Sequence, residues 1–143
     1  QWAQAYQSLS QALGPQAAPL TLPEQVKFLT LRAEAALALQ QYTAAMADFE
    51  FLLKTSPADS RLLQGLGLAQ VGQGHIEAAL AIFNPLIAKN PSAAAYYGRA
   101  MAYLQLGNTA ASLQDLDQTI ALEPSNPRYQ AIRTQIAAGQ APR

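Results

Sequence analysis

Apolar side chains recur every three or four positions over most of this chain, with polar side chains between them. This spacing is typical of helices that bury one face. It predicts a first long helix over residues 21–40 and a second from about Tyr42 to Lys54, which Pro57 ends. Thr21 and Glu24, three positions apart with Pro23 between them, are the start signal of the first helix.

The same helix–turn–helix pattern is written three times in one register. Each copy carries a small residue in its first helix, a second small residue in its second helix, an apolar residue one turn later, and a proline. These marks are Ala33, Ala45, Phe49 and Pro57, then Gly67, Ala79, Phe83 and Pro91, then Ala100, Ser112, Leu116 and Pro124. All four marks move by 34 residues to the second copy and by 33 to the third. This period predicts stacked helix hairpins whose small residues let the helix axes approach closely.

The layout resembles the tetratricopeptide repeat (TPR) family. The second copy carries the family's pattern at Gly67, Gly74, Ala79, Phe83 and Pro91. The first copy has Gln40 where glycine is usual, and the third has Ser112 for alanine and Leu116 for the aromatic residue. The resemblance covers residues 26–124. It implies an all-α fold, an α-α superhelix or right-handed solenoid of stacked helix hairpins with flanking terminal helices.

We expect a single domain over residues 1–143. Its expected segments are an N-terminal helix or half repeat (2–13), a loop (14–22), three repeats (23–57, 58–91 and 92–124) and a C-terminal capping helix (126–139). Residues 2–13 have the spacing of a second helix, so either an upstream repeat is cut or this helix covers the first full unit. Gln1 in place of methionine suggests an excised fragment. Within the second repeat, Pro85 predicts a kink or an early helix end near residues 83–85.

Composition removes several classes of function. Nine basic and nine acidic side chains give zero formal charge, so we expect neither nucleic-acid binding nor attachment to an anionic membrane surface. The sequence has no cysteine, and its one histidine, His75, falls in a turn. Asp48 with Glu50 and Asp115 with Asp117 diverge on their helices, so we expect these four carboxylates on solvated faces. No catalytic, metal or cofactor site is therefore expected, and no enzyme activity.

No apolar run is long enough to span a membrane, so direct membrane insertion is not expected. The compartment stays open: the cytoplasm is the default, and a membrane-anchored parent protein is the alternative. Trp2 lies at helix spacing from Ala5 and Tyr6, and we expect it to pack on its own core instead of serving as an exposed anchor.

In TPR proteins, ligands usually lie along the concave face made by the first helices of the repeats. The register carries the predicted partner-binding groove onto Lys27, Leu31, Glu34, Arg61, Gln64, Leu68, Tyr97 and Met101. Four of these are large apolar residues, and Gly65 and Gly98 are expected to lower the floor beneath them. Exposed apolar surface of this kind suits a short apolar peptide or an amphipathic helix.

One subgroup of the family grips the C-terminal carboxylate of chaperones with Lys, Asn and Arg side chains. The matching positions here lack those donors; they are Thr30, Glu34, Gly65, Ala94 and Gly98. A chaperone tail is therefore not the expected partner. The sequence predicts a noncatalytic protein-interaction scaffold, and the alternative is a self-associating array, a homo-oligomer that stacks through exposed repeat ends.

Overall fold

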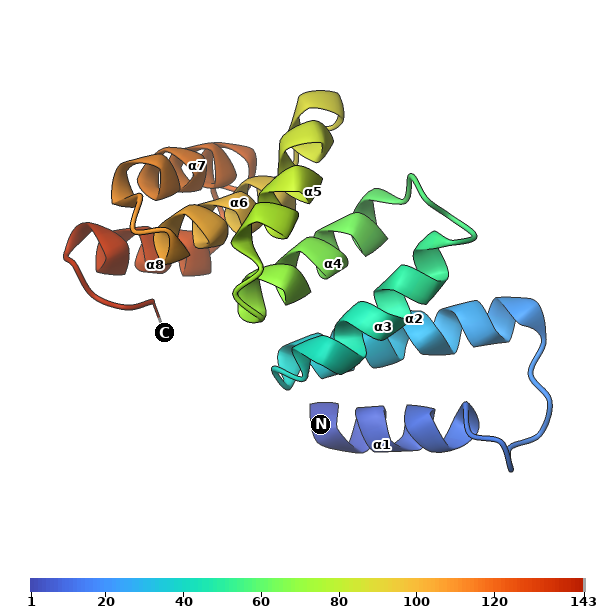
Figure 1. The fold of residues 1–143 in the computed structure, drawn as a ribbon. Helices are drawn as coiled ribbons and strands as arrows, with labels where there is room; N and C mark the ends of the chain where they lie inside the picture. Colours follow the sequence, from blue (N-terminus) through green and yellow to red (C-terminus); the bar gives the residue numbers. More distant parts are fainter. Residues whose placement is uncertain (143) are drawn as a thin grey trace. The chain divides into compact units, whose positions relative to one another are not determined.

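The computed structural model describes residues 1–142, which form eight α-helices and no strand (Figure 1). The helices are α1 (Trp2–Ala12), α2 (Leu22–Ala38), α3 (Tyr42–Leu53), α4 (Ser60–Gly72), α5 (Ile76–Lys89), α6 (Ala93–Gln105), α7 (Thr109–Leu122) and α8 (Pro127–Ala137). The expected all-α class is confirmed. No helix in the described part of the chain combines the length and the apolar character needed to cross a membrane.

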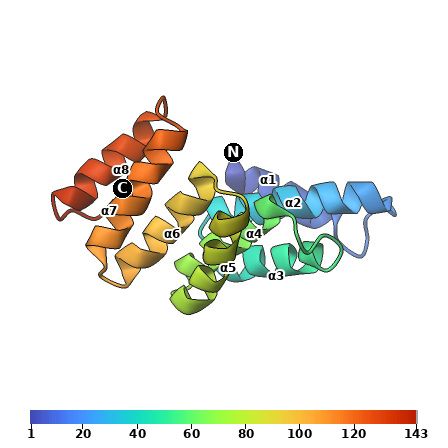
Figure 2. The same cartoon turned by 90° about the horizontal axis from the view of Figure 1, so that it is seen from above.

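The helices gather into two compact units. The first is Gln1–Gln73, with α1 to α4, and the second begins at Gly74, with α5 to α8. In the first unit, α2 packs between α1 and α3, and α3 also packs on α4. In the second, α6 packs between α5 and α7, and α8 packs on α7 (Figure 2). The expected grouping of these helices into three repeats within one domain stays a prediction.

Local sequence signals begin and end the helices where expected. The backbone N–H of Thr21 donates to Glu24 Oε2 at 2.9 Å, and the Thr21 hydroxyl donates to the same oxygen at 2.6 Å, so the predicted capping box is present. These two hydrogen bonds, that of the side chain first, hold the pKa of Glu24 below its ordinary value. At the start of α6, Ser92 Oγ accepts from the backbone N–H of Ala95 at 3.2 Å.

The small residues at the helix crossings are buried as predicted. Ala33, Ala45, Ala79, Ala100 and Ser112 are all 0% exposed. Burial at this level leaves no room for a larger side chain, which is what close approach of two helix axes requires.

Two phenylalanine rings fill the seams between successive helices. Phe49 on α3 lies over Gly65 on α4, and a Cβ built on Gly65 would lie 2.3 Å from the ring carbon Cζ. Phe83 on α5 lies over Gly98 on α6, where the same distance is 2.2 Å. Both glycines are buried. The prediction that Gly65 and Gly98 form the floor of an open groove is therefore wrong, because each faces the ring of the preceding helix.

The early helix end expected near residues 83–85 is wrong, because α5 continues to Lys89; the alternative of a kink there stays a prediction. Pro85 and Ala81, whose carbonyl loses its partner, are both exposed, so water can satisfy that carbonyl. The expectation that Trp2 packs on its own core is also wrong, because Trp2 is 54% exposed.

Candidate functional site

Six of the eight predicted groove residues lie in the first unit, on α2 and α4. Arg61 Nη2 on α4 donates to Glu34 Oε1 on α2 at 2.5 Å, so the structure brings these two together as an ion pair. Leu31 is 40% exposed, and Lys27 is exposed one turn before it. Gln64 and Leu68 on α4 are half-buried. In this part of the predicted site, the apolar residues Leu31 and Leu68 lie near the Arg61–Glu34 ion pair, whose two charges cancel.

The other two predicted residues lie in the second unit, on α6. Tyr97 and Met101 are half-buried and pack on a core cluster formed by Ala100, Leu116, Ile132 and Ile136. The Tyr97 ring lies 5.5 Å from the ring of Tyr129 on α8, with the two planes inclined at 43°. The guanidinium carbon of Arg128 lies 5.9 Å from the centre of the Tyr97 ring. Tyr97, Met101, Arg128 and Tyr129 together form what we call the aromatic surface.

The aromatic surface has a defined protonation state. Burial raises the pKa of Tyr129, and the nearby carboxylate of Glu123 raises it further. The Tyr129 phenol is therefore neutral at physiological pH and can donate a hydrogen bond. Tilted aromatic pairs and a cation over a ring are both stabilising contacts, so the three side chains hold one another in place.

Sequence reasoning missed Tyr129 and Arg128 as site residues. Tyr129 follows Tyr96 by 33 positions, the period of the array, so the register places α8 beside α6 as the next first helix. That signal predicts the helix but not the ring contact. The contact depends on the side-chain rotamer of Tyr97, which decides whether its ring faces Tyr129 on α8.

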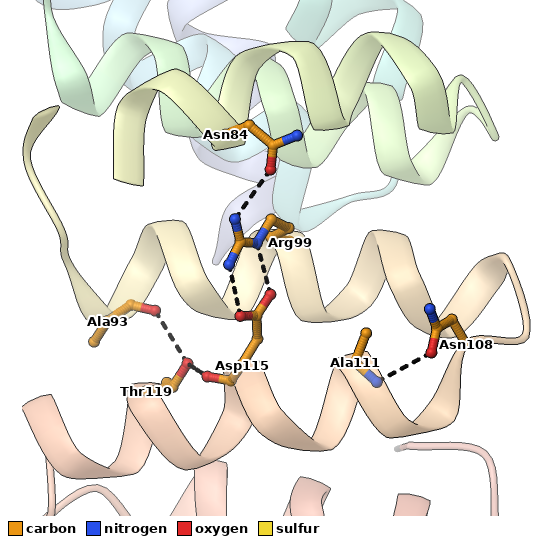
Figure 3. A network of polar contacts seen from close by, with 7 residues as sticks. All are labelled: Asn84, Ala93, Arg99, Asn108, Ala111, Asp115 and Thr119. Atoms are coloured by element: carbon orange, nitrogen blue, oxygen red, sulfur yellow. Dashed lines mark hydrogen bonds and ion pairs between the residues drawn. The ribbon is translucent and has the colours of Figure 1, made fainter. Parts of the chain in front are cut away.

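The second unit contains a part-buried polar network around Arg99 (Figure 3). Arg99 Nε and Nη2 donate to the two carboxylate oxygens of Asp115, each at 2.8 Å, and Nη1 donates to Asn84 Oδ1 at 3.0 Å. The rings of Tyr96 and Tyr103 each lie 5.7 Å from the guanidinium carbon. The hydrogen bonds to Asp115 raise the pKa of Arg99 above its ordinary value.

The first unit repeats the pair, with Arg32 Nε and Nη2 donating to Asp48 at 2.8 and 2.6 Å. The expectation that Asp48 and Asp115 lie on solvated faces is therefore wrong, since they are 6% and 5% exposed. Each is neutralised by an arginine sixteen positions earlier, on the facing helix. Both pairs join neighbouring helices and hold no carboxylate ready for acid–base chemistry.

Metal-binding geometry is absent from residues 1–142, where no three His, Cys, Asp or Glu side chains come together in a way that could hold an ion. His75 is exposed at the N-terminal end of α5.

Antiparallel helix pairs with recurring small residues at their crossings define the chain as an all-α helical-repeat protein. Residues 65–127 match the family model described as tetratricopeptide repeat. This match agrees with the tetratricopeptide repeat resemblance found in the sequence.

Two solved structures share the fold. A MamA RS-1 double mutant is 18% identical, with a TM-score of 0.67, over 96% of this chain and 75% of that one. MamA from Desulfovibrio magneticus RS-1 is 19% identical, with a TM-score of 0.66, over 96% of this chain and 85% of that one. At these identities the likeness concerns the fold alone. A comparison with the curated proteins found no match.

Proposed function

We propose that this chain is a noncatalytic protein-interaction scaffold that binds a short apolar peptide or an amphipathic helix of a partner at the aromatic surface. The tetratricopeptide repeat match supports the general class, and its residues 65–127 include all of α6. Complex assembly or recruitment is the role that such binding would serve.

The observation that carries the proposal is the braced tyrosine pair. Tyr97 and Tyr129 are half-buried, with their rings 5.5 Å apart, and Arg128 lies over the Tyr97 ring. Rings that are already fixed lose little conformational entropy when a partner covers them. Tyr and Arg are also the residue types that dominate binding energy at interfaces. Met101 beside them adapts to apolar side chains of different shape.

The predicted site residues of the first unit, on α2 and α4, would provide a second contact surface for the partner. Leu31 and Leu68 offer apolar area, and Lys27 carries a charge near them. Because Arg61 is paired with Glu34 at 2.5 Å, it sets the orientation of a partner more than the affinity. The pairing also argues against recognition of a carboxylate tail, since this surface has little net positive charge.

The test selects short peptides from a random library on the intact chain and measures their affinity by calorimetry. The double variant Tyr97→Ala with Met101→Ala is expected to lose about 30-fold or more in affinity, as two removed anchor side chains would. Tyr129→Ala is expected to weaken binding as well. Trp2→Ala, which removes an exposed aromatic residue from the other unit, is the matched control and should leave affinity unchanged. Unchanged affinity in the folded double variant would remove the aromatic surface from consideration.

A self-associating array is the second candidate. It is favoured by Trp2 on α1, a large apolar side chain that is 54% exposed. Apolar surface exposed at the end of a repeat array is what allows copies to stack end to end.

A further inference from the structure

The first unit contains a cavity of about 370 Å³ between the end of α1, the loop that follows it, and the outer parts of α2 and α3. Its principal apolar lining is Leu13, Leu20, Leu29 and Phe51, and its polar lining is Gln25 and Arg32. A cavity of this size falls within the range of small-molecule sites, which are typically apolar with a few polar groups that fix orientation.

Arg32 brings an unused donor to this cavity. Its Nε and Nη2 donate to Asp48, but Nη1 makes no hydrogen bond within residues 1–142. The equivalent atom of Arg99 in the second unit donates to Asn84 Oδ1 at 3.0 Å. The hydrogen bonds from arginine to aspartate are alike in the two units, so the second unit shows which kind of atom completes the first: a neutral amide oxygen.

The register explains why space is left beside Arg32 but taken up around Arg99. Tyr96 and Tyr103, which flank Arg99, correspond to Leu29 and Ala36, each 67 positions earlier. The spacing that aligns Leu9 with Phe83 places Ser10 at the position of Asn84. Of the three replacements, Leu29 lines the cavity, so a leucine here in place of a tyrosine leaves part of this space.

Gln25 adds the complementary polar group. Its Nε2 donates to the carbonyl oxygen of Leu20 at 3.0 Å, while its Oε1 makes no hydrogen bond in the described part of the chain. The cavity therefore offers one donor at Arg32 and one acceptor at Gln25. An amide carries both the matching acceptor and the matching donor.

We propose that this cavity binds an aliphatic amide, whose apolar body lies against the leucines and Phe51 while its carbonyl oxygen accepts from Arg32 Nη1 and its N–H donates to Gln25 Oε1. The ligand is neutral, because Asp48 already neutralises Arg32 and a carboxylate would place a second negative charge beside it. The site lies wholly in the first unit and does not depend on the aromatic surface.

The test titrates the isotope-labelled chain with N-acetyl-leucinamide and follows the Arg32 side-chain nitrogen signals and the methyl signals of Leu13 and Leu29 by NMR. The expected result is saturable shifts with a dissociation constant of about 1 mM. The carboxylate 4-methylpentanoate should bind at least tenfold more weakly.

Two variants fill the cavity while keeping Arg32 itself. Ala17→Leu fills it from the loop, and Leu29→Tyr imports the residue found beside Arg99. Each should weaken N-acetyl-leucinamide at least tenfold, whereas Ala38→Leu on the exposed surface of α2 should change nothing. Circular dichroism and thermal unfolding confirm that the variants are folded.

Three results would overturn the proposal: no saturation, equal or tighter binding of 4-methylpentanoate, or unchanged affinity in both filled variants. A blocked Ala-Leu-Ala peptide then separates two sources of the same chemistry. Tighter binding than the single amide identifies a polypeptide segment as the ligand, and weaker binding identifies a free small molecule.

Discussion

Gln40 holds a backbone conformation that the corresponding turns assign to glycine. Its φ is 60°, while Gly74 and Gly107 have φ of 80° and 74°. A side chain in this left-handed region costs about 1 kcal/mol relative to glycine. Gln40→Gly is therefore expected to raise the free energy of unfolding by about 1 kcal/mol in urea denaturation. Gln41→Gly, at a φ of −85°, is the control and should give no gain; a loss of stability in Gln40→Gly would contradict the argument.

Ser112 occupies a crossing position where the other two copies have alanine. It is 0% exposed, and its Oγ has no hydrogen-bond partner among the described residues. Ser112→Ala removes an unsatisfied buried hydroxyl and should raise the free energy of unfolding by about 1 kcal/mol. Thr119→Val is the contrast, because the Thr119 hydroxyl donates to the carbonyl oxygen of Asp115 at 2.9 Å; this change should lower stability by about 1 kcal/mol. Thermal unfolding in which both substitutions move stability in the same direction would refute the assignment.

The Arg32–Asp48 ion pair joins α2 to α3, and the second copy of the repeat has two apolar residues at the equivalent positions. Leu66 and Ile82 stand 34 positions after Arg32 and Asp48, at the same places in the second copy. Asp48→Ile alone leaves a part-buried guanidinium unpaired and should cost about 2 kcal/mol, whereas Arg32→Leu with Asp48→Ile should fall within about 1 kcal/mol of the parent. Urea denaturation of the four proteins of the cycle measures this. A double variant no more stable than Asp48→Ile would contradict it.

The Phe83–Gly98 contact makes a second prediction about helix packing. Alanine at position 98 would place its Cβ 2.2 Å from a ring that is fully buried. Gly98→Ala should therefore lower the free energy of unfolding by about 1 to 2 kcal/mol, despite the better helix propensity of alanine. In a Phe83→Leu background the same change should be neutral or stabilising, because leucine lacks the ring carbons that clash. Chemical denaturation measures the change in the free energy of unfolding in each background. Equal changes in the two backgrounds would show that the Phe83 ring does not restrict the size of the side chain at position 98.

Patterns along one helix could be predicted from the sequence, and relations across helices largely could not. The Thr21–Glu24 capping box and the buried small residues follow from local spacing. The burial of Asp48 does not, because its partner Arg32 lies on another helix and spacing within α3 says nothing about it. For the same reason, spacing alone puts Gly65 and Gly98 on the groove face, whereas each faces a phenylalanine ring of the preceding helix. The repeat register predicts two of the four residues of the aromatic surface, Tyr97 and Met101.

At the scale of the whole molecule, the two candidate functions predict different behaviour in solution. The proposed scaffold should sediment as one copy over a wide range of protein concentration. A self-associating array should instead show a mass that rises with concentration, and Trp2→Ala should lower it again, because Trp2 is 54% exposed on α1. Sedimentation at several concentrations decides between them, and a strict monomer excludes the array.

The ring-over-glycine seam also bears on how such a protein can change in length. Phe49 precedes Gly65 by sixteen positions, and Phe83 precedes Gly98 by fifteen. The two ring–glycine contacts are therefore nearly the same local structure, repeated along the chain. An in-frame duplication of residues 50–83 would give the new ring a glycine sixteen positions downstream. Unequal recombination within the gene could therefore lengthen the protein by one unit while leaving every seam filled.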